Sequence, residues 1–286
     1  MYNTENLSPF TENEIKKFDN DFIYSKTPTS KIDITHRKLL KFIIGVSKSS
    51  PSLAIYGNTG KIPVSLKRYR LTLNFWHRVT YLPNSSLVKK ALLENIDLRT
   101  NWIITIEKLI NTLKLSDKIG NHTKFKNATK HALENGFREW WIKSLDDPDL
   151  SRLLFYKKIK SEFGMERYLE IPNFQQRIYI GKIRCSDQEL EIEKGRHKKG
   201  NAHTLVQDRL CIICKNGEVE DEEHFLLKCN QYNGLRLKHG IIQLNEASAF
   251  FNDNNLYTVG NFLYEAFKLG EEIVKTSRGA IEGDVG

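Results

Sequence analysis

The chain has 286 residues, of which 40% are hydrophobic and 10% aromatic, and its formal net charge is +9. This length can hold one large or two medium domains with a substantial core, and the composition excludes an intrinsically disordered protein. No apolar run approaches the roughly 18 residues needed to span a bilayer, and the N-terminus MYNTENLSPFTENE is too polar for a signal peptide. We therefore expect a soluble intracellular protein, nuclear or cytoplasmic, that does not enter a membrane.

The positive charge is concentrated in one part of the chain. Residues 31–100 contain 13 Lys and Arg against 3 Asp and Glu, whereas residues 211–286 carry a net charge of −5. Such clustering favours a surface that faces RNA or DNA. A solvated, lysine-rich surface without a ligand has the same composition, so both interpretations stay open.

The N-terminal part begins with a polar segment and then becomes helical. Residues 1–30 lack periodicity and predict a disordered tail. The helical pattern that follows Thr35 ends at Gly45, a residue suited to terminate a helix. A loop then leads to a short apolar turn that closes at Gly57 and Gly60.

A basic amphipathic helix is predicted after Pro63, because proline is favoured at the first position of a helix. Its apolar stripe recurs at three- and four-residue steps: Leu66, Tyr69, Leu73 and Trp76. An adjacent stripe carries Lys67, Arg70 and Arg78. These three side chains are candidate phosphate contacts, although most basic helix faces are only solvated.

Helical patterns continue through the middle of the chain, at 86–93, 101–115, 122–145, 149–163 and 173–185. The pair Asp146-Asp147 lies between two of them and precedes Pro148. This context predicts a helix end followed by the cap of the next helix, at Asp149 or Ser151, and not a metal-binding catalytic pair. We found no other recognisable nucleophile, general base or phosphate loop, and we expect no enzymatic activity.

The most informative motif is C-x2-C-x9-H-x4-C, formed by Cys211, Cys214, His224 and Cys229. Three thiolates and one imidazole fill a tetrahedral zinc site and leave no position for substrate, which is typical of a structural zinc knuckle. A short hairpin of 209–214 and 217–219 and a helix through His224 would present these ligands. The alternative is that the cysteines are small buried apolar side chains, as we expect for Cys185.

Basic residues flank this motif on its N-terminal side. Arg196, Lys198 and Lys199 lie in a Gly-bounded segment, and Arg209 follows them. They are candidate phosphate contacts, or else part of a solvated loop. Two further helices are predicted at 232–239 and 258–268, and residues 276–286 predict a disordered end.

Several segments together resemble the C-terminal region of reverse transcriptases from LINE-type, non-LTR retrotransposons. They are LLKFIIGVSKSSPSLAIYG at 39–57, GKIPVSL at 60–66, NFWHR at 74–78, LEIEKGR at 190–196, the Cys211–Cys229 motif with EDEEHFLL, and FLYEAFK at 262–268. In order, they span about four-fifths of the chain. The resemblance implies that Cys211, Cys214, His224 and Cys229 hold structural zinc and that the region grips template RNA or target DNA. Since the fingers, the palm and the catalytic aspartates have no room here, polymerase activity is not expected.

Together these observations predict a mainly α fold with a small CCHC zinc knuckle. The expected organisation is a tail (1–30), a helical basic domain (31–185), a zinc-knuckle region (186–240), a C-terminal helical segment (241–275) and a second tail (276–286). The expected function is a non-catalytic nucleic-acid-binding module, a truncated fragment of a retrotransposon reverse transcriptase. A zinc-stabilised protein-interaction module and an inert relic reading frame are the alternatives.

Overall fold

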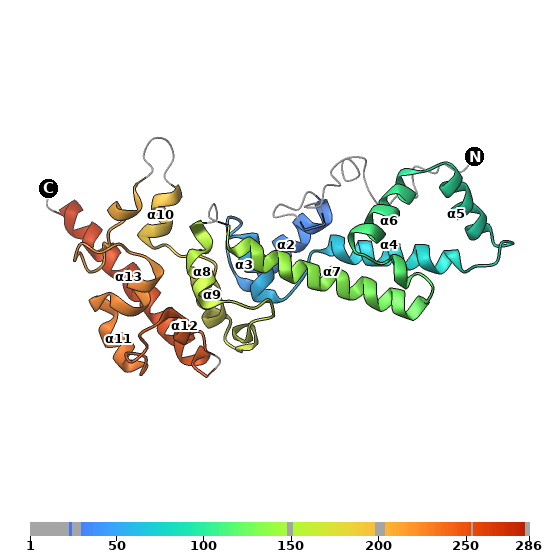
Figure 1. Ribbon diagram of the computed structural model, residues 1–286. Helices are drawn as coiled ribbons and strands as arrows, with labels where there is room; N and C mark the ends of the chain where they lie inside the picture. Colours follow the sequence, from blue (N-terminus) through green and yellow to red (C-terminus); the bar gives the residue numbers. More distant parts are fainter. Residues whose placement is uncertain (1–22, 25–29, 148–150, 198–203, 253, 284–286) are drawn as a thin grey trace. The chain divides into compact units, whose positions relative to one another are not determined.

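The computed structural model describes residues 23–24, 30–147, 151–197, 204–252 and 254–283 (Figure 1). These residues are mainly helical, and apart from two isolated bridges they form no β-strand. The predicted mainly α fold class is confirmed. Within the same residues, none of the helices combines the length and apolar character that crossing a bilayer requires.

The chain divides into two compact units. Unit 1 contains Met1–Arg37 and Ile62–Ser144, and unit 2 contains Lys38–Lys61 and Leu145–Gly286. The predicted domain of 31–185 is therefore not one body, because residues 38–61 pack with the C-terminal half. Asn58 illustrates this: its side-chain oxygen Oδ1 accepts a hydrogen bond from Arg184 Nε at 2.8 Å, and its side-chain nitrogen Nδ2 lies 3.3 Å from the sulfur of Cys185.

Unit 1 consists of helices that follow the predicted apolar stripes. It contains α4 (Val64–Thr80), α5 (Leu87–Asp97), α6 (Asn101–Thr112) and all but the last residue of α7 (His122–Leu145), and α2 (Lys31–Ile44) begins in it. On α4, Leu66, Tyr69 and Leu73 are buried, as the stripe predicts. Val79 packs with Leu92 and Ile103 of the next two helices, so amphipathic patterning alone builds this part of the fold.

Helix α7 confirms its predicted bounds, 122–145. Phe125, Leu133, Phe137 and Trp141 recur at four- and eight-residue steps and are almost completely buried. The described residue Tyr24 packs on this helix: its hydroxyl donates to the carbonyl of Ala132 at 3.3 Å. Most of the predicted tail 1–30 lies outside the described residues.

Unit 2 contains the remaining helices and several single helical turns. The helices are α3 (Ser52–Thr59), α8 (Leu154–Ile159), α9 (Phe174–Arg184), α10 (Glu191–His197), α11 (Asn233–Lys238), α12 (Ala247–Phe250) and α13 (Leu256–Gly283). Two differences from the sequence analysis concern short elements. The expected apolar turn is helix α3, and Glu191–His197, for which no helix is predicted, form α10. Leu53–Thr59 are all buried, so tertiary packing stabilises a helix too short to be predicted.

The C-terminal helix is longer than predicted. The backbone of α13 stays helical to Gly283, beyond residue 276, where we expected a disordered end. Its first turns pack along α9, where Val259, Phe262 and Leu263 are fully buried. The packed N-terminal turns of α13 nucleate the helix, and the more polar C-terminal turns extend from them.

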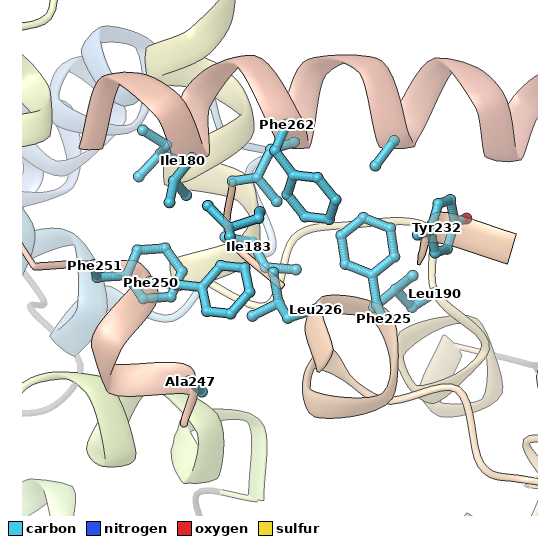
Figure 2. Packing of buried hydrophobic residues seen from close by; sticks show 14 of the residues in the cluster. Ile180, Ile183, Leu190, Phe225, Leu226, Tyr232, Ala247, Phe250, Phe251 and Phe262 are labelled. Carbon is cyan, nitrogen blue, oxygen red and sulfur yellow. The ribbon is translucent and has the colours of Figure 1, made fainter. Parts of the chain in front are cut away.

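The core of unit 2 joins α9 and α13 to the segment that contains the cysteine motif. Figure 2 shows Phe262 of α13 facing Ile183 of α9, with Phe225 and Leu226 from the cysteine segment beside them. Phe225 contacts the rings of Tyr232 and Phe267 at centroid distances of 5.0 and 4.9 Å. The cysteine motif is thus built onto a hydrophobic core and is not an appendage.

Candidate metal centre

The chain reverses direction between the first two cysteines and the histidine. An isolated antiparallel bridge pairs Leu210 with Val219, and Cys211 N donates to the Glu218 carbonyl at 2.8 Å. Gly217 has φ of 82°, a left-handed conformation that glycine adopts without strain. The predicted hairpin is reduced to this single bridge, but the reversal still brings Cys211 and Cys214 towards the following helical turn.

A polar cap starts that turn. The carboxylate of Asp221 accepts a hydrogen bond from His224 N at 2.7 Å, which satisfies a donor at the helix start. The backbone then winds as a π-helical turn over His224–Lys228, and Cys229 N donates to the His224 carbonyl at 2.8 Å. The wide turn places the side chains of His224 and Cys229 on the same side as Cys211.

The four side chains of the motif come together. One donor atom from each of Cys211, Cys214, His224 and Cys229 lies within 4.8 Å of all the others. Cys211, His224 and Cys229 are buried, whereas Cys214 is half-buried. Tetrahedral zinc with Zn–S bonds of about 2.3 Å separates its ligand atoms by about 3.8 Å, so the group is close enough to hold a metal ion and compatible with zinc.

Hydrogen bonding and burial act differently on the three thiols. A hydrogen bond from Cys211 lowers the pKa of the Cys229 thiol, and the same bond raises the pKa of Cys211, with burial acting in the same direction. Burial raises the pKa of Cys214. The protein alone thus eases ionisation of Cys229 and opposes that of Cys211 and Cys214, and a bound cation would favour the thiolate form of all three.

Two carboxylates and one arginine support the centre. Glu218 Oε2 lies 2.8 Å from His224 Nδ1, while His224 Nε2 lies 3.4 Å from the sulfur of Cys214. Glu220 Oε1 lies 3.4 Å from the sulfur of Cys211. Arg236 is buried, and its guanidinium donates to the carbonyls of Phe225, Leu226 and Cys229. Sequence reasoning missed these supporting roles, because Glu218, Glu220 and Arg236 all stand outside the Cys/His spacing of the motif.

The candidate phosphate contacts of α4 remain accessible. Lys67 and Arg78 are exposed and Arg70 is half-buried. The guanidinium of Arg78 lies 5.6 Å from the ring centroid of Phe75, a cation–π contact that holds it at the surface. In the described part of the chain, none of the three forms an ion pair.

The candidate contacts beside the motif are different. Arg209 is buried, and its guanidinium donates to the carbonyls of Ile192 and Thr204 at 2.8–3.1 Å. Arg196 forms an ion pair of 2.6 Å with Glu193. Both arginines therefore have partners within the fold, and their role as phosphate contacts stays a prediction. Lys198 and Lys199 lie outside the described residues.

The acidic pair is a helix end. Helix α7 stops at Leu145, and the exposed Asp146 forms an ion pair with Lys157. The predicted cap at Asp149 lies outside the described residues.

Comparison with known proteins gives no relative for this chain: it matches no protein-family model, no curated protein and no solved structure.

Proposed function

We propose that the chain is a non-catalytic nucleic-acid-binding module in which one structural zinc ion stabilises unit 2. Its ligands are Cys211, Cys214, His224 and Cys229, and unit 1 supplies the main contacts to RNA or DNA. The sequence resemblance suggests descent from the C-terminal region of a non-LTR retrotransposon reverse transcriptase.

The observation that supports this proposal most strongly is the gathering of all four motif donors within 4.8 Å. Four protein ligands of sulfur and nitrogen saturate zinc, so the ion would stabilise the fold and would not activate water. The core residue Phe225 directly follows His224, so metal binding and packing of unit 2 would be coupled.

The charge of unit 1 supports the proposed binding of RNA or DNA. The described residues 30–37 and 62–144 of unit 1 contain 17 Lys and Arg against 7 Asp and Glu. Besides Lys67 and Arg78, exposed cations line α7, namely Lys124, Lys126, Lys130, Arg138 and Lys143. Such an excess attracts a polyanion and makes binding strongly dependent on salt.

The zinc proposal is tested by the metal content of the purified chain. We expect one zinc per chain, lost in Cys211→Ser and in Cys229→Ser. Cys185→Ser is the matched control, because Cys185 is buried away from the motif donors, and it should keep the metal. Stoichiometric zinc that survives both ligand substitutions contradicts the assignment.

The nucleic-acid proposal is tested by fluorescence anisotropy with RNA, single-stranded DNA and duplex DNA. Affinity should fall steeply between about 50 and 200 mM salt, and replacing both Lys67 and Arg78 by Gln should reduce the salt slope by about 2. Replacing the acidic residues Glu134 and Glu139 of α7 by Gln serves as the control and should not weaken binding. No binding to any of the three ligands at low salt excludes the proposal.

A protein-interaction module is the second candidate, favoured by exposed apolar side chains of unit 1. Leu71, Leu87 and Leu98 are 64%, 81% and 61% exposed. If these side chains form one contiguous apolar patch, that patch marks a partner-binding surface. This candidate gains support if a partner binds with little salt dependence and Leu87→Ser abolishes its binding.

A further inference from the structure

A cavity of about 680 Å³ lies within unit 2, beside the cysteine segment. Its volume is in the range of small-molecule sites. Helix α9, helix α13 and the loop that carries Ile212 and Ile213 contribute to the lining. None of the four proposed zinc ligands lines the cavity, so a ligand here would bind beside the metal and not on it.

The cavity wall contains a buried hydrogen-bond acceptor without a donor. Gln188 is 4% exposed, and its amide nitrogen Nε2 donates to Oε1 of Glu222 at 2.9 Å. This bond fixes the orientation of the amide, because a carboxylate can only accept. Within the described part of the chain, no group donates to Oε1 of Gln188, although the residue lines the cavity. A buried acceptor without a donor is costly, so the site favours a ligand that carries an N–H or O–H group.

The charged residues of the lining favour a cation. The lining contains four carboxylates and three ammonium groups, those of Asp187, Glu189, Glu220 and Glu271 and those of Lys182, Lys194 and Lys275. Lys194 forms an ion pair of 2.9 Å with Glu191, which is not part of the lining. The most buried of these charges is Glu220, at 3% exposed, whereas Lys182 is half-buried and Lys275 exposed. A cation beside the buried carboxylate gains more than the exposed lysines cost it, because water and salt screen the exposed charges.

Aromatic rings form the apolar part of the lining. The ring of Tyr179 stacks on Phe267 with a centroid distance of 5.1 Å and an interplanar angle of 18°. Phe225 and Tyr232 line the cavity as well, and Figure 2 shows their rings beside each other. The faces of such rings attract cations, and the Lys182 ammonium already lies 5.6 Å from the centroid of the Tyr179 ring. A ligand that combines an ammonium group with an apolar body would match both parts of the lining.

The carboxylates of the lining are too dispersed to chelate a metal ion. Among the residues that the structure describes, the Cys/His motif is the only group of three or more potential ligands that lies close enough to hold one. Hard cations such as Mg²⁺ and Ca²⁺ need several oxygen ligands within about 2.6 Å of the ion. The cavity therefore suits an organic cation, whose charge separated carboxylates can share.

We infer that this cavity binds a small organic amine in its protonated form, with an aromatic or alkyl body. The ammonium N–H donates to Oε1 of Gln188 and is attracted by the surrounding carboxylates, while the apolar body packs on the Tyr179–Phe267 pair. The inference goes beyond the proposed function, since it adds a small-molecule ligand to the proposed zinc ion and nucleic acid. It does not depend on either of them.

Three compounds of similar shape test the charge of the ligand: phenethylamine is the cation, phenylethanol the neutral analogue and phenylpropanoate the anion. Isothermal titration of the full chain at about pH 7 should give the tightest binding for phenethylamine and about fivefold weaker binding for phenylethanol, because hydrogen bonds from a charged donor are stronger. Phenylpropanoate should not bind. Equal or tighter binding of the anion, or no binding of phenethylamine at millimolar concentration, overturns the site.

A lysine side chain of a peptide presents the same ammonium group. Blocked lysine, acetylated on its α-nitrogen and amidated on its carboxyl group, is therefore a further probe. It should bind more weakly than phenethylamine, because its alkyl body packs less well on aromatic rings. Tighter binding of blocked lysine overturns the assignment to a small amine in favour of a peptide side chain.

Charge substitutions should act with opposite signs. Glu271→Gln should weaken phenethylamine binding about threefold, whereas Lys182→Gln should strengthen it by a similar factor. Glu272→Gln and Lys268→Gln are the matched controls, because both residues are exposed on α13 outside the lining, and the Lys268 ammonium also lies over a tyrosine ring. Both controls should bind phenethylamine like the unmodified chain.

Gln188→Leu tests the buried acceptor. It should weaken phenethylamine binding about tenfold, because a hydrogen bond to a charged donor is lost. If this variant does not fold, the Glu271 and Lys182 variants decide alone, since both of these side chains reach solvent. Unchanged binding in Glu271→Gln and in Lys182→Gln places the ligand elsewhere and overturns the site.

Discussion

The carboxylate of Glu218 lies 2.8 Å from Nδ1 of His224, whereas the other ring nitrogen, Nε2, faces the sulfur of Cys214. A carboxylate can only accept a hydrogen bond, so Nδ1 carries the proton and Nε2 keeps its lone pair. This tautomer is the one that donates to a metal from Nε2. Glu218 therefore orients and polarises the imidazole as an outer partner of the metal ligand.

Glu218→Gln should weaken zinc binding about tenfold without changing its stoichiometry, because the amide orients the ring but supplies no negative charge. Competition with a chromogenic chelator measures this affinity. Glu170→Gln, an exposed substitution in unit 2, is the control and should leave the zinc affinity unchanged. An unaltered affinity in Glu218→Gln shows that the contact with His224 has no such role.

Removal of the metal should loosen unit 2 and spare unit 1. All four tryptophans, Trp76, Trp102, Trp140 and Trp141, belong to unit 1. We expect a strong chelator to increase amide hydrogen exchange in 211–232 while tryptophan emission stays constant. A simultaneous change of both observables argues instead for cooperative unfolding of the whole chain.

Substitution of Arg209 should change stability and substitution of Lys67 should change binding, although the sequence predicts a phosphate contact at each. Arg209→Ala removes the donors to the buried Ile192 carbonyl and the half-buried Thr204 carbonyl, and it should destabilise unit 2 by about 3 kcal/mol in denaturant unfolding. Lys67→Ala removes an exposed charge, so it should change stability by less than about 0.5 kcal/mol but reduce the salt slope of binding by about 1. Equal stability of the two variants contradicts the structural role of Arg209.

His77 should make unit 1 sensitive to acid. Its ring is fully buried, and burial lowers its pKa below the usual 6.5. Nε2 lies 2.7 Å from the Ile119 carbonyl and so carries the proton, which leaves Nδ1 as the acceptor 3.0 Å from His122 Nδ1. Protonation of His77 therefore removes this acceptor and places a charge in the core.

In the unfolded chain His77 binds a proton near pH 6.5, whereas in the folded chain it binds one only at lower pH. The stability that neutral, buried His77 contributes is therefore complete above pH 6.5. It is lost as the pH falls from 6.5 towards the lower folded pKa, with a slope of at most about 1.4 kcal/mol per pH unit. Thermal melts followed by tryptophan emission should show this decrease, and His77→Gln should flatten it. His131→Gln, exposed on α7, should keep the pH dependence of the unmodified chain.

Periodicity predicted the long helices well, because α4 and α7 bury one stripe each and need little else. The short α3 was missed, since its residues are buried on every side and its sequence shows no amphipathic contrast. For the candidate metal centre, spacing identified the four side chains that the fold brings together. Spacing could not separate Lys67 from Arg209: both are basic residues near a predicted element, and only the fold shows that Arg209 donates to backbone carbonyls.

The interleaving of the two units constrains how the protein is made on the ribosome. Residues 38–61 leave the ribosome early, yet α3 meets its partners only when Arg184 and Cys185 have been synthesised, more than a hundred residues later. Until then the apolar side chains of Leu53–Thr59 have no core to enter, whereas most of unit 1 is already complete. During that interval the nascent chain exposes a hydrophobic segment without a packing partner. Such a segment can bind chaperones or misassemble. Any shortened version that begins after residue 61 removes part of the unit that contains the candidate metal centre.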